Sequence, residues 1–371
     1  MDATPDHNRP LRILQVVDCL NGGGLQTMLL EWLRRLPRDR FQTEVVSLFG
    51  PGPLSPAFEQ AGFPVTHLAP FRWHPMIPLR LAPWLRRDYD LVHAHLVISS
   101  FLCERMMPPS RLDRLVVHVH NPACGSGRYQ DWIERFAYRR AGHVLAFSKH
   151  VLGTVGPRKT GRVLYNGVDT ERFTPPTEEE RAAARAKFGL PGNAFVVGAV
   201  GRLAPQKNHA LLLNAFATAH KALPGARLLV AGDGPLRGAL EEQARRLGLA
   251  EVVHFAGFQE DILPCLAAMD VYAMSSRYEG HSISLMEAMA CGLPCVSTAY
   301  PGAEEVIVPE ETGCLVSPDD APALAEALLR LGGGPELRRR LGAATRTSIA
   351  ASFSLDSSAN ALAAFYHGVT R

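Results

Sequence analysis

The fold is decided by the apolar run Phe195-Val-Val-Gly-Ala-Val-Gly201, the helical pattern His209-Ala-Leu-Leu-Leu-Asn-Ala-Phe-Ala-Thr-Ala-His-Lys221, and the second apolar run Arg227-Leu-Leu-Val-Ala231. Apolar runs of this length predict buried strands, and the repeat of apolar residues between them predicts an amphipathic helix. Two buried strands joined by a helix are typical of a parallel sheet with a right-handed crossover.

The same alternation continues in both directions along the chain. Further strands are expected at 11–17, 43–48, 91–95, 115–120, 143–148, 252–255, 271–274 and 294–297. Further helices are expected at 25–36, 236–247, 261–269, 283–290 and 321–331, with a last helix at about 355–371. The pattern pauses only at Asn166–Asp169 and at the polar, proline-bearing stretch Thr174–Glu180. The sequence therefore predicts an α/β protein with two Rossmann-like, doubly wound parallel-sheet domains, residues 1–175 and 176–354.

The composition is that of an ordinary globular chain. Of the 371 residues, 47% are hydrophobic and 20% are charged, which argues against disorder. A formal net charge of +3 is too small to suggest a nucleic-acid-binding protein. The N-terminal residues lack the apolar core of a signal peptide, and no apolar run approaches the roughly 20 residues that span a bilayer. Seven scattered cysteines fit reduced thiols in a cytoplasmic protein, and we expect that location.

Two glutamates stand eight positions apart in Glu279-Gly-His-Ser-Ile-Ser-Leu-Met-Glu287, a segment that spans an expected helix start. Free amides at a helix start can seat a diphosphate, and here they belong to Gly280, His281, Ser282, Ile283 and Ser284. Glu287 would accept hydrogen bonds from ribose hydroxyls, as acidic residues do in Rossmann domains. Glu279 would hold the transferred sugar and stabilise positive charge as the glycosidic bond breaks. The alternative is a capped helix with two solvated glutamates.

Two cations, Arg202 and Lys207, share the loop that follows the strand 195–201. Arg202 can bind a phosphate bidentately, and Lys207 can act as a point charge. Together they could offset the charge that builds on a departing nucleoside diphosphate. The alternative is two ordinary surface cations.

The spacing of the two glutamates, followed by Ala-Met-Ala-Cys-Gly-Leu-Pro294, resembles retaining glycosyltransferase family four, the glycosyl transferases group 1. The resemblance implies the GT-B fold, in which two Rossmann-like domains face each other across the donor cleft. It implies that the C-terminal domain binds the donor and that the last helix, at about 355–371, crosses back onto the N-terminal acceptor domain. It also implies retention at the anomeric carbon, with no metal and no other cofactor. His281-Ser282 departs from the Phe with Gly or Pro that is frequent in the family, so the donor sugar is not predicted.

Two further motifs gain a role from the resemblance. The glycines Gly22, Gly23 and Gly24 follow the first strand, where they let the backbone approach a ligand closely. In the family this loop faces the donor phosphates or the acceptor, whereas a plain tight turn is the alternative. Phe258 follows a strand at the family's nucleobase pocket, so we expect it to border the base unless it only packs.

Histidines occur in two doublets, His93-Ala-His95 and His118-Val-His120. Alternate residues of a strand share a face, so each doublet presents two imidazoles on one side. A zinc site would need a third ligand, which the sequence does not place. The resemblance implies that His120 is a catalytic residue near the donor sugar and the acceptor. A structural histidine is the alternative for each of the four.

These motifs predict a retaining, metal-independent hexosyltransferase that takes its sugar from a nucleotide-diphosphate donor, with a UDP-sugar favoured. The expected acceptor is a hydroxyl of a glycan, a lipid-linked or a small molecule, in polysaccharide, lipid-linked glycan or glycolipid assembly. Cations and aromatic residues within 71–87 suggest peripheral contact with the inner membrane surface, with a packed helix as the alternative. Two rival functions remain: a nucleotide-sugar epimerase of the same architecture, which needs no acceptor, and a non-catalytic nucleotide-sugar-binding protein.

Overall fold

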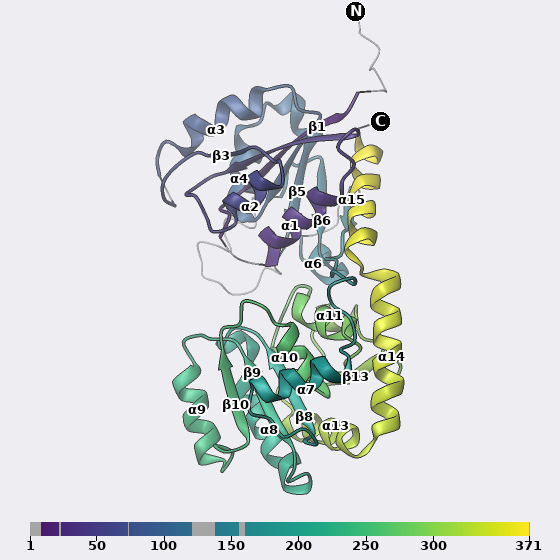
Figure 1. The fold of residues 1–371 in the computed structure, drawn as a ribbon. Coiled ribbons are helices and arrows are strands. Elements are labelled where there is room, and N and C mark those ends of the chain that lie inside the picture. Colours follow the sequence, from purple (N-terminus) through teal and green to yellow (C-terminus); the bar gives the residue numbers. More distant parts are fainter. Residues whose placement is uncertain (1–8, 22–23, 73, 121–137, 156–159, 371) are drawn as a thin grey trace, which may run out of the picture. The chain divides into compact units, whose positions relative to one another are not determined.

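The computed structural model describes residues 9–21, 24–72, 74–120, 138–155 and 160–370, which form two compact units. Unit 1 comprises residues 1–167 and 355–371, and unit 2 comprises residues 168–354 (Figure 1). The division lies at 167/168 rather than at 175/176. Residues just after it are held in unit 2, because Arg346 donates hydrogen bonds to the carbonyls of Thr170 and Phe173 at 2.8 and 2.7 Å.

Unit 1 contains a seven-stranded parallel sheet with the order β3-β2-β1-β4-β5-β6-β7. Its strands are β1 (Leu11–Val17), β2 (Phe41–Ser47), β3 (Val65–His67), β4 (Leu91–His95), β5 (Leu115–Val119), β6 (His143–Ala146) and β7 (Gly161–Val163). Its described helices are α1 (Gly24–Arg35), α2 (Ser55–Gln60), α3 (Ile77–Arg86), α4 (Val97–Met106), α6 (Lys149–Thr154) and α15 (Leu355–Val369).

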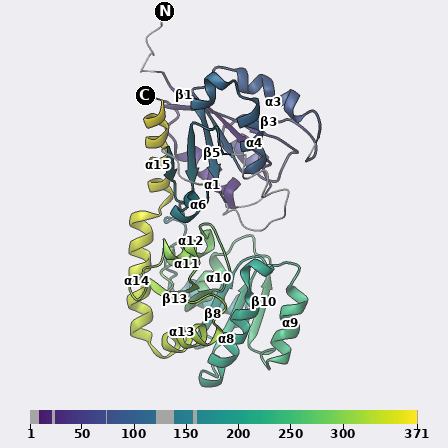
Figure 2. The ribbon, with the colours of Figure 1, turned by 180° about the vertical axis from the view of Figure 1, so that it is seen from behind.

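Helices cover both faces of this sheet (Figures 1 and 2). On one face, Leu14 and Val16 of β1 share a buried core with Leu81 of α3. Alternate residues of a strand point to opposite faces, so Gln15 points to the other side, where α1 and α15 pack together. The C-terminal helix therefore completes the covering of the unit 1 sheet.

Unit 2 contains a six-stranded parallel sheet with the order β10-β9-β8-β11-β12-β13. Its strands are β8 (Val196–Val200), β9 (Arg227–Ala231), β10 (Val253–Gly257), β11 (Val271–Met274), β12 (Cys295–Thr298) and β13 (Gly313–Val316). Its helices are α7 (Glu178–Lys187), α8 (His209–Ala222), α9 (Arg237–Arg246), α10 (Leu263–Ala268), α11 (Ile283–Ala290), α12 (Pro301–Glu304), α13 (Ala321–Gly333) and α14 (Pro335–Ser352).

In both sheets the chain adds strands from a central strand toward one edge, and then returns to the centre and adds the remaining strands toward the other edge. This is the doubly wound strand order. The prediction of two Rossmann-like parallel-sheet domains is therefore confirmed. The reversal lies between β1 and β4 in unit 1 and between β8 and β11 in unit 2. In sheets of this kind, ligands bind beyond the carboxyl ends of the strands at the reversal. The loop after β8 carries Arg202 and Lys207, the loop after β11 carries Glu279, and Glu287 lies in the helix α11 that follows.

Within the basic and aromatic segment 71–87, residues Ile77–Arg86 form α3, whose Ile77, Leu81 and Leu85 are buried in unit 1. Leu79 of α3 is exposed, and so is Phe71, which precedes the helix. The structure therefore contains the packed helix, with apolar and basic side chains on its open edge. Among the residues described, no helix combines the length and apolar character that crossing a membrane requires.

Candidate functional site

The centre of the candidate site is an ion pair between Lys207 and Glu279, which the chain separates by many residues. The Nζ atom of Lys207 lies 2.7 Å from Oε1 of Glu279, and both side chains are largely shielded from solvent. The hydroxyl of Ser276 donates a further hydrogen bond to the same oxygen at 3.1 Å. Lys207 follows β8 and Glu279 follows β11, so the pair spans the sheet reversal of unit 2.

Hydrogen bonds join the loops that carry this pair. The Ser275 hydroxyl donates to the Lys207 backbone carbonyl at 3.0 Å, and the side-chain amide of Gln206 donates to the Tyr278 backbone carbonyl at 2.9 Å. In return, the backbone amide of Arg277 donates to the Gln206 carbonyl at 2.9 Å. The Lys207–Glu279 geometry is therefore fixed by the backbone of both loops as well as by charge.

The Arg202 loop is also held from its other side, by the turn after β9. The amide of Gly201 donates to the Ala231 carbonyl, and that of Leu203 to the Asp233 carbonyl, each at 2.9 Å. A Cβ atom at Gly232 would overlap the carbonyl oxygen of Gly201, and Gly232 has a φ of +140°. Glycine at 232 thus allows close packing of the two loops.

Helix α11 begins at Ile283 and presents its first amides beside the ion pair. Ser282 is the N-cap residue and makes no capping hydrogen bond with its side chain, so the first turn keeps donors for a ligand. The Ser284 hydroxyl instead accepts a hydrogen bond from Tyr272 at 2.9 Å. Ser284 therefore ties α11 to β11 through its side chain, and only its amide is left for a phosphate.

Glu287 lies one turn into α11 and is partly buried. Burial raises the pKa of its carboxyl group from 4.5 to about 7, and the positive charge of Arg172 opposes that rise. A carboxyl group with such a pKa is partly protonated near neutral pH, so it can accept hydrogen bonds from hydroxyl groups and, when protonated, also donate one. The sequence reasoning did not single out Arg172, because it lies in the segment that precedes the second sheet.

The neighbours Gly280 and His281 are buried rather than solvated. Burial lowers the pKa of the His281 imidazole to about 3, so this side chain is neutral at physiological pH. Its ring centroid lies 5.5 Å from that of Phe353. The His281 side chain packs in unit 2 and contributes no positive charge.

Arg202 and Phe258 both extend into solvent from the carboxyl edge of the unit 2 sheet. Arg202 is exposed and makes no ion pair within the described ranges. Phe258 follows β10 with 77% of its side chain exposed, so it is not a core residue. An exposed aromatic ring at this edge can stack against a base.

In unit 1, the predicted glycine loop is only partly described. Gly22 and Gly23 lie outside the described residues, and Gly24 is the first residue of α1. Asp18, just after β1, is buried and accepts a hydrogen bond from the Ser99 amide at the start of α4 at 2.8 Å. Burial raises the pKa of its carboxyl group to about 6.

His120 is buried beside three other histidines at the carboxyl ends of β4 and β5. The strands pair in parallel with His95 opposite His118, so both doublets lie on the sheet face covered by α1 and α15. Ring centroids lie 4.4 Å apart for His118 and His120 and 5.6 Å apart for His95 and His120. The structure therefore gathers four imidazoles that the sequence left as two separate doublets.

Comparison with known protein families accounts for both units. Residues 180–348 match the family described as "Glycosyl transferases group 1", and residues 22–172 match "Glycosyltransferase Family 4". This chain is a family 4 glycosyltransferase. The predicted resemblance to this family is therefore confirmed.

The names of the relatives of this glycosyltransferase refer to different substrates and pathways. It is 35% identical over 208 residues to the Corynebacterium glutamicum GDP-mannose-dependent monoacylated alpha-(1-6)-phosphatidylinositol monomannoside mannosyltransferase, a match that spans 54% of either chain. It is 29% identical over 268 residues to the lipopolysaccharide core biosynthesis mannosyltransferase LpsB of Rhizobium meliloti, covering 70% of this chain and 74% of LpsB.

The solved structure of Anabaena Alr3699/HepE in complex with UDP matches with a TM-score of 0.85 and 23% identity, covering 96% of this chain and all of that one. The structure of WaaG, a glycosyltransferase involved in lipopolysaccharide biosynthesis, matches with a TM-score of 0.75 and 19% identity, covering 96% of this chain and all of that one. These likenesses confirm the GT-B fold class.

Sequence reasoning on this glycosyltransferase missed contacts rather than residue types. Ser276, three residues before Glu279, was not singled out, yet its hydroxyl donates a hydrogen bond to Glu279. His93, His95 and His118 were noted as doublets, and only the pairing of β4 with β5 brings them together. The available signal was that consecutive strands of a predicted parallel sheet each ended in the same His-x-His pattern.

Proposed function

We propose that this glycosyltransferase moves a sugar, with retention at the anomeric carbon, from a nucleotide-diphosphate donor to an acceptor hydroxyl. The observation that carries the proposal is the Lys207–Glu279 ion pair beside the uncapped start of α11. Cation, carboxylate and free amides then lie together at the sheet reversal of unit 2, where Rossmann-like sheets bind nucleotides.

The donor would bind unit 2 through complementary charges. The amides of α11, with Arg202 and Lys207, would hold the diphosphate, because a helix start and two cations favour an anion. Glu287 would accept hydrogen bonds from the ribose, and Phe258 would stack against the base. Lys207 has three N–H donors, so it can keep its contact with Glu279 while binding a phosphate oxygen.

In the transfer step the bond between the anomeric carbon and the diphosphate oxygen breaks, and the electron pair leaves with the nucleoside diphosphate. Arg202, Lys207 and the α11 amides would stabilise that charge, so the transfer itself is proposed to need no metal. The acceptor oxygen forms the new bond on the same face and gives its proton to the departing phosphate. Glu279 would stabilise the positive charge on the sugar, with His120 beside the sugar and the acceptor.

We place the acceptor among glycans and lipid-linked sugars, and the donor among UDP-sugars with GDP-mannose as the competitor. The C. glutamicum and R. meliloti relatives carry names of lipid-linked and lipopolysaccharide mannosyltransferases. On unit 1, Phe71 and Leu79 are exposed, and so are Arg80 and Arg86 of α3, a combination that suits peripheral contact with an anionic membrane surface.

A thermal-shift panel with UDP-, GDP- and ADP-sugars tests the donor. One nucleotide class should raise the melting temperature, and Lys207→Ala should abolish the shift, whereas Lys221→Ala, an exposed cation on α8, should keep it. NMR analysis of the product would then give the anomeric configuration. A product formed without any acceptor would instead indicate an epimerase, and an inverted product would contradict retention.

A further inference from the structure

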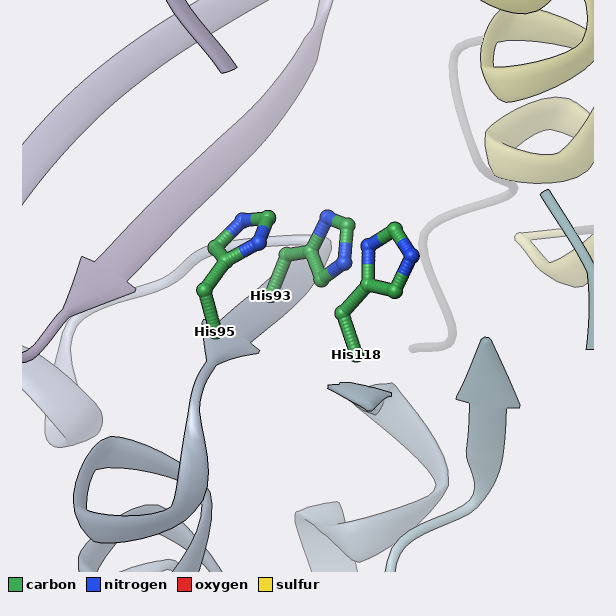
Figure 3. Close-up of side chains that lie close together, drawn as sticks. All are labelled: His93, His95 and His118. Atoms are coloured by element: carbon green, nitrogen blue, oxygen red, sulfur yellow. The ribbon is translucent and has the colours of Figure 1, made fainter. Parts of the chain in front are cut away.

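Unit 1 contains a group of buried histidines that the proposed sugar transfer does not explain. His93, His95 and His118 each offer one ring nitrogen, and these three atoms lie within 4.8 Å of one another. Figure 3 shows the three rings side by side, with His93 and His95 from β4 and His118 from β5. All three side chains are fully buried, between the sheet and the helices α1 and α15.

Most nitrogens of this group have no hydrogen-bond partner among the described residues. Nε2 of His93, Nδ1 of His95 and both ring nitrogens of His118 are buried without one. A buried polar atom without a partner costs about 1–3 kcal/mol, so several together need a physical reason. Their burial also lowers the pKa of all three imidazoles, which keeps the rings neutral and able to donate a lone pair.

The remaining nitrogens are held in a way that directs the free ones. Nε2 of His95 lies 2.8 Å from Oε1 of Gln15, and that oxygen can only accept, so Nε2 carries the proton and Nδ1 is left bare. Nδ1 of His93 lies 2.7 Å from the Tyr366 hydroxyl, which also accepts a hydrogen bond from the Gln15 amide at 3.0 Å. Histidines that bind metals are typically oriented by such contacts at their other nitrogen.

We propose that His93, His95 and His118 bind a divalent transition-metal ion of the zinc type, in a site that stabilises unit 1. Zinc–nitrogen bonds are about 2.0–2.1 Å long, so tetrahedral ligand atoms lie about 3.3 Å apart, and modest ring rotations would bring the three nitrogens together. Three neutral imidazoles leave the charge of the ion uncompensated. A water or hydroxide at the fourth position therefore suits the site, unless His120, whose ring lies 4.4 Å from that of His118, takes that position.

Binding of Zn²⁺ to the full chain tests this proposal without donor or acceptor, so the outcome is independent of sugar transfer. After treatment with a chelator, calorimetry should show one Zn²⁺ bound per chain, and Co²⁺ should give the visible absorption bands of a tetrahedral site. Zn²⁺ should also raise the melting temperature. His118→Gln should weaken binding at least about 100-fold, whereas His254→Gln, an exposed histidine of unit 2, should change nothing.

Gln15→Ala keeps all three ligands and should weaken Zn²⁺ binding about 10–100-fold, because it removes the group that orients His95. This variant keeps the test valid if His118→Gln fails to fold, which circular dichroism would reveal. His120→Gln separates the two candidates for the fourth position, since only a ligand role predicts weaker binding. The proposal is overturned if the wild-type chain binds no stoichiometric Zn²⁺, or binds it as tightly after Gln15→Ala and His118→Gln; buried water would then satisfy the imidazoles.

Discussion

At the residue scale, we expect Glu279 to oppose donor binding and to favour transfer through the same negative charge. Its carboxylate neutralises Lys207 at 2.7 Å, and the same charge can stabilise the sugar as it becomes positive. Glu279→Gln keeps the size of the side chain but removes the charge. We expect the affinity for the nucleoside diphosphate to stay the same or rise, while turnover falls about 100-fold or more, a loss typical of removing one electrostatic stabiliser.

Calorimetry and steady-state kinetics on the same preparation measure both effects. Glu336→Gln is the matched control, because Glu336 also forms an ion pair, with Arg339, but is 80% exposed. A drop in nucleotide affinity in Glu279→Gln, with unchanged turnover, would show that Glu279 belongs to the nucleotide contact and does not stabilise the sugar.

Glu287 gives a second prediction at this scale, from its pKa of about 7 in the folded chain and 4.5 as its ordinary value. Between these values the unfolded chain releases the proton while the folded chain retains it, so rising pH favours unfolding. Glu287→Gln removes this dependence. From pH 4.5 to pH 8 the wild type should therefore lose about 1–3 kcal/mol of stability relative to the variant. Melting curves of both proteins across this pH range measure the difference in stability. If the stabilities of the two proteins changed with pH in the same way, the raised pKa of Glu287 would be contradicted.

At the element scale, the position of Arg202 and Lys207 depends on a turn that carries neither residue. The turn after β9 packs against Gly201 through Gly232, which has no room for a Cβ atom. Gly232→Ala should therefore displace the Arg202 loop, destabilise the chain by about 1–3 kcal/mol and weaken nucleotide binding without removing any ligand contact. Gly238→Ala is the control, because Gly238 lies in α9 with open space around it and alanine favours a helix. Nucleotide affinity equal to wild type in Gly232→Ala would show that the loop position does not depend on this packing.

The elements themselves were predicted well where burial is continuous. The bounds of β1, β4, β9 and β11 agree with the expected strands, because each is a continuous run of largely buried residues. The sequence analysis missed β3 and β7, each of three residues, and β13, of four residues, because so short a run carries no periodic signal. All three are outermost strands, β3 and β7 in the unit 1 sheet and β13 in the unit 2 sheet.

The contacts of the candidate site needed the order of the strands, which periodicity does not provide. Lys207 and Glu279 meet because β8 lies beside β11, although β9 and β10 intervene in the chain. Sequence reasoning placed both residues in loops at the correct ends of strands. The ion pair between them, and the gathering of the histidine doublets on β4 and β5, appear only once these strands are known to be neighbours.

At the scale of the whole molecule, the chain has two units with separate cores. The residues proposed to bind the nucleotide all lie in unit 2. A ligand that binds only the folded state stabilises it by about 2.7 kcal/mol when present at 100 times its dissociation constant. For a nucleoside diphosphate, that gain should slow amide hydrogen exchange mainly within unit 2, in peptides that cover 200–209 and 275–290. Exchange in α1 and α15 should change much less, because these helices belong to the core of unit 1.

Hydrogen-exchange mass spectrometry with and without UDP or GDP measures how this protection is distributed along the chain. Lys207→Ala is the variant in which the protection should vanish. Protection confined to unit 1 would move the nucleotide site away from the Lys207–Glu279 pair. Protection at 275–290 that persists in Lys207→Ala would leave the α11 amides as the main phosphate contact.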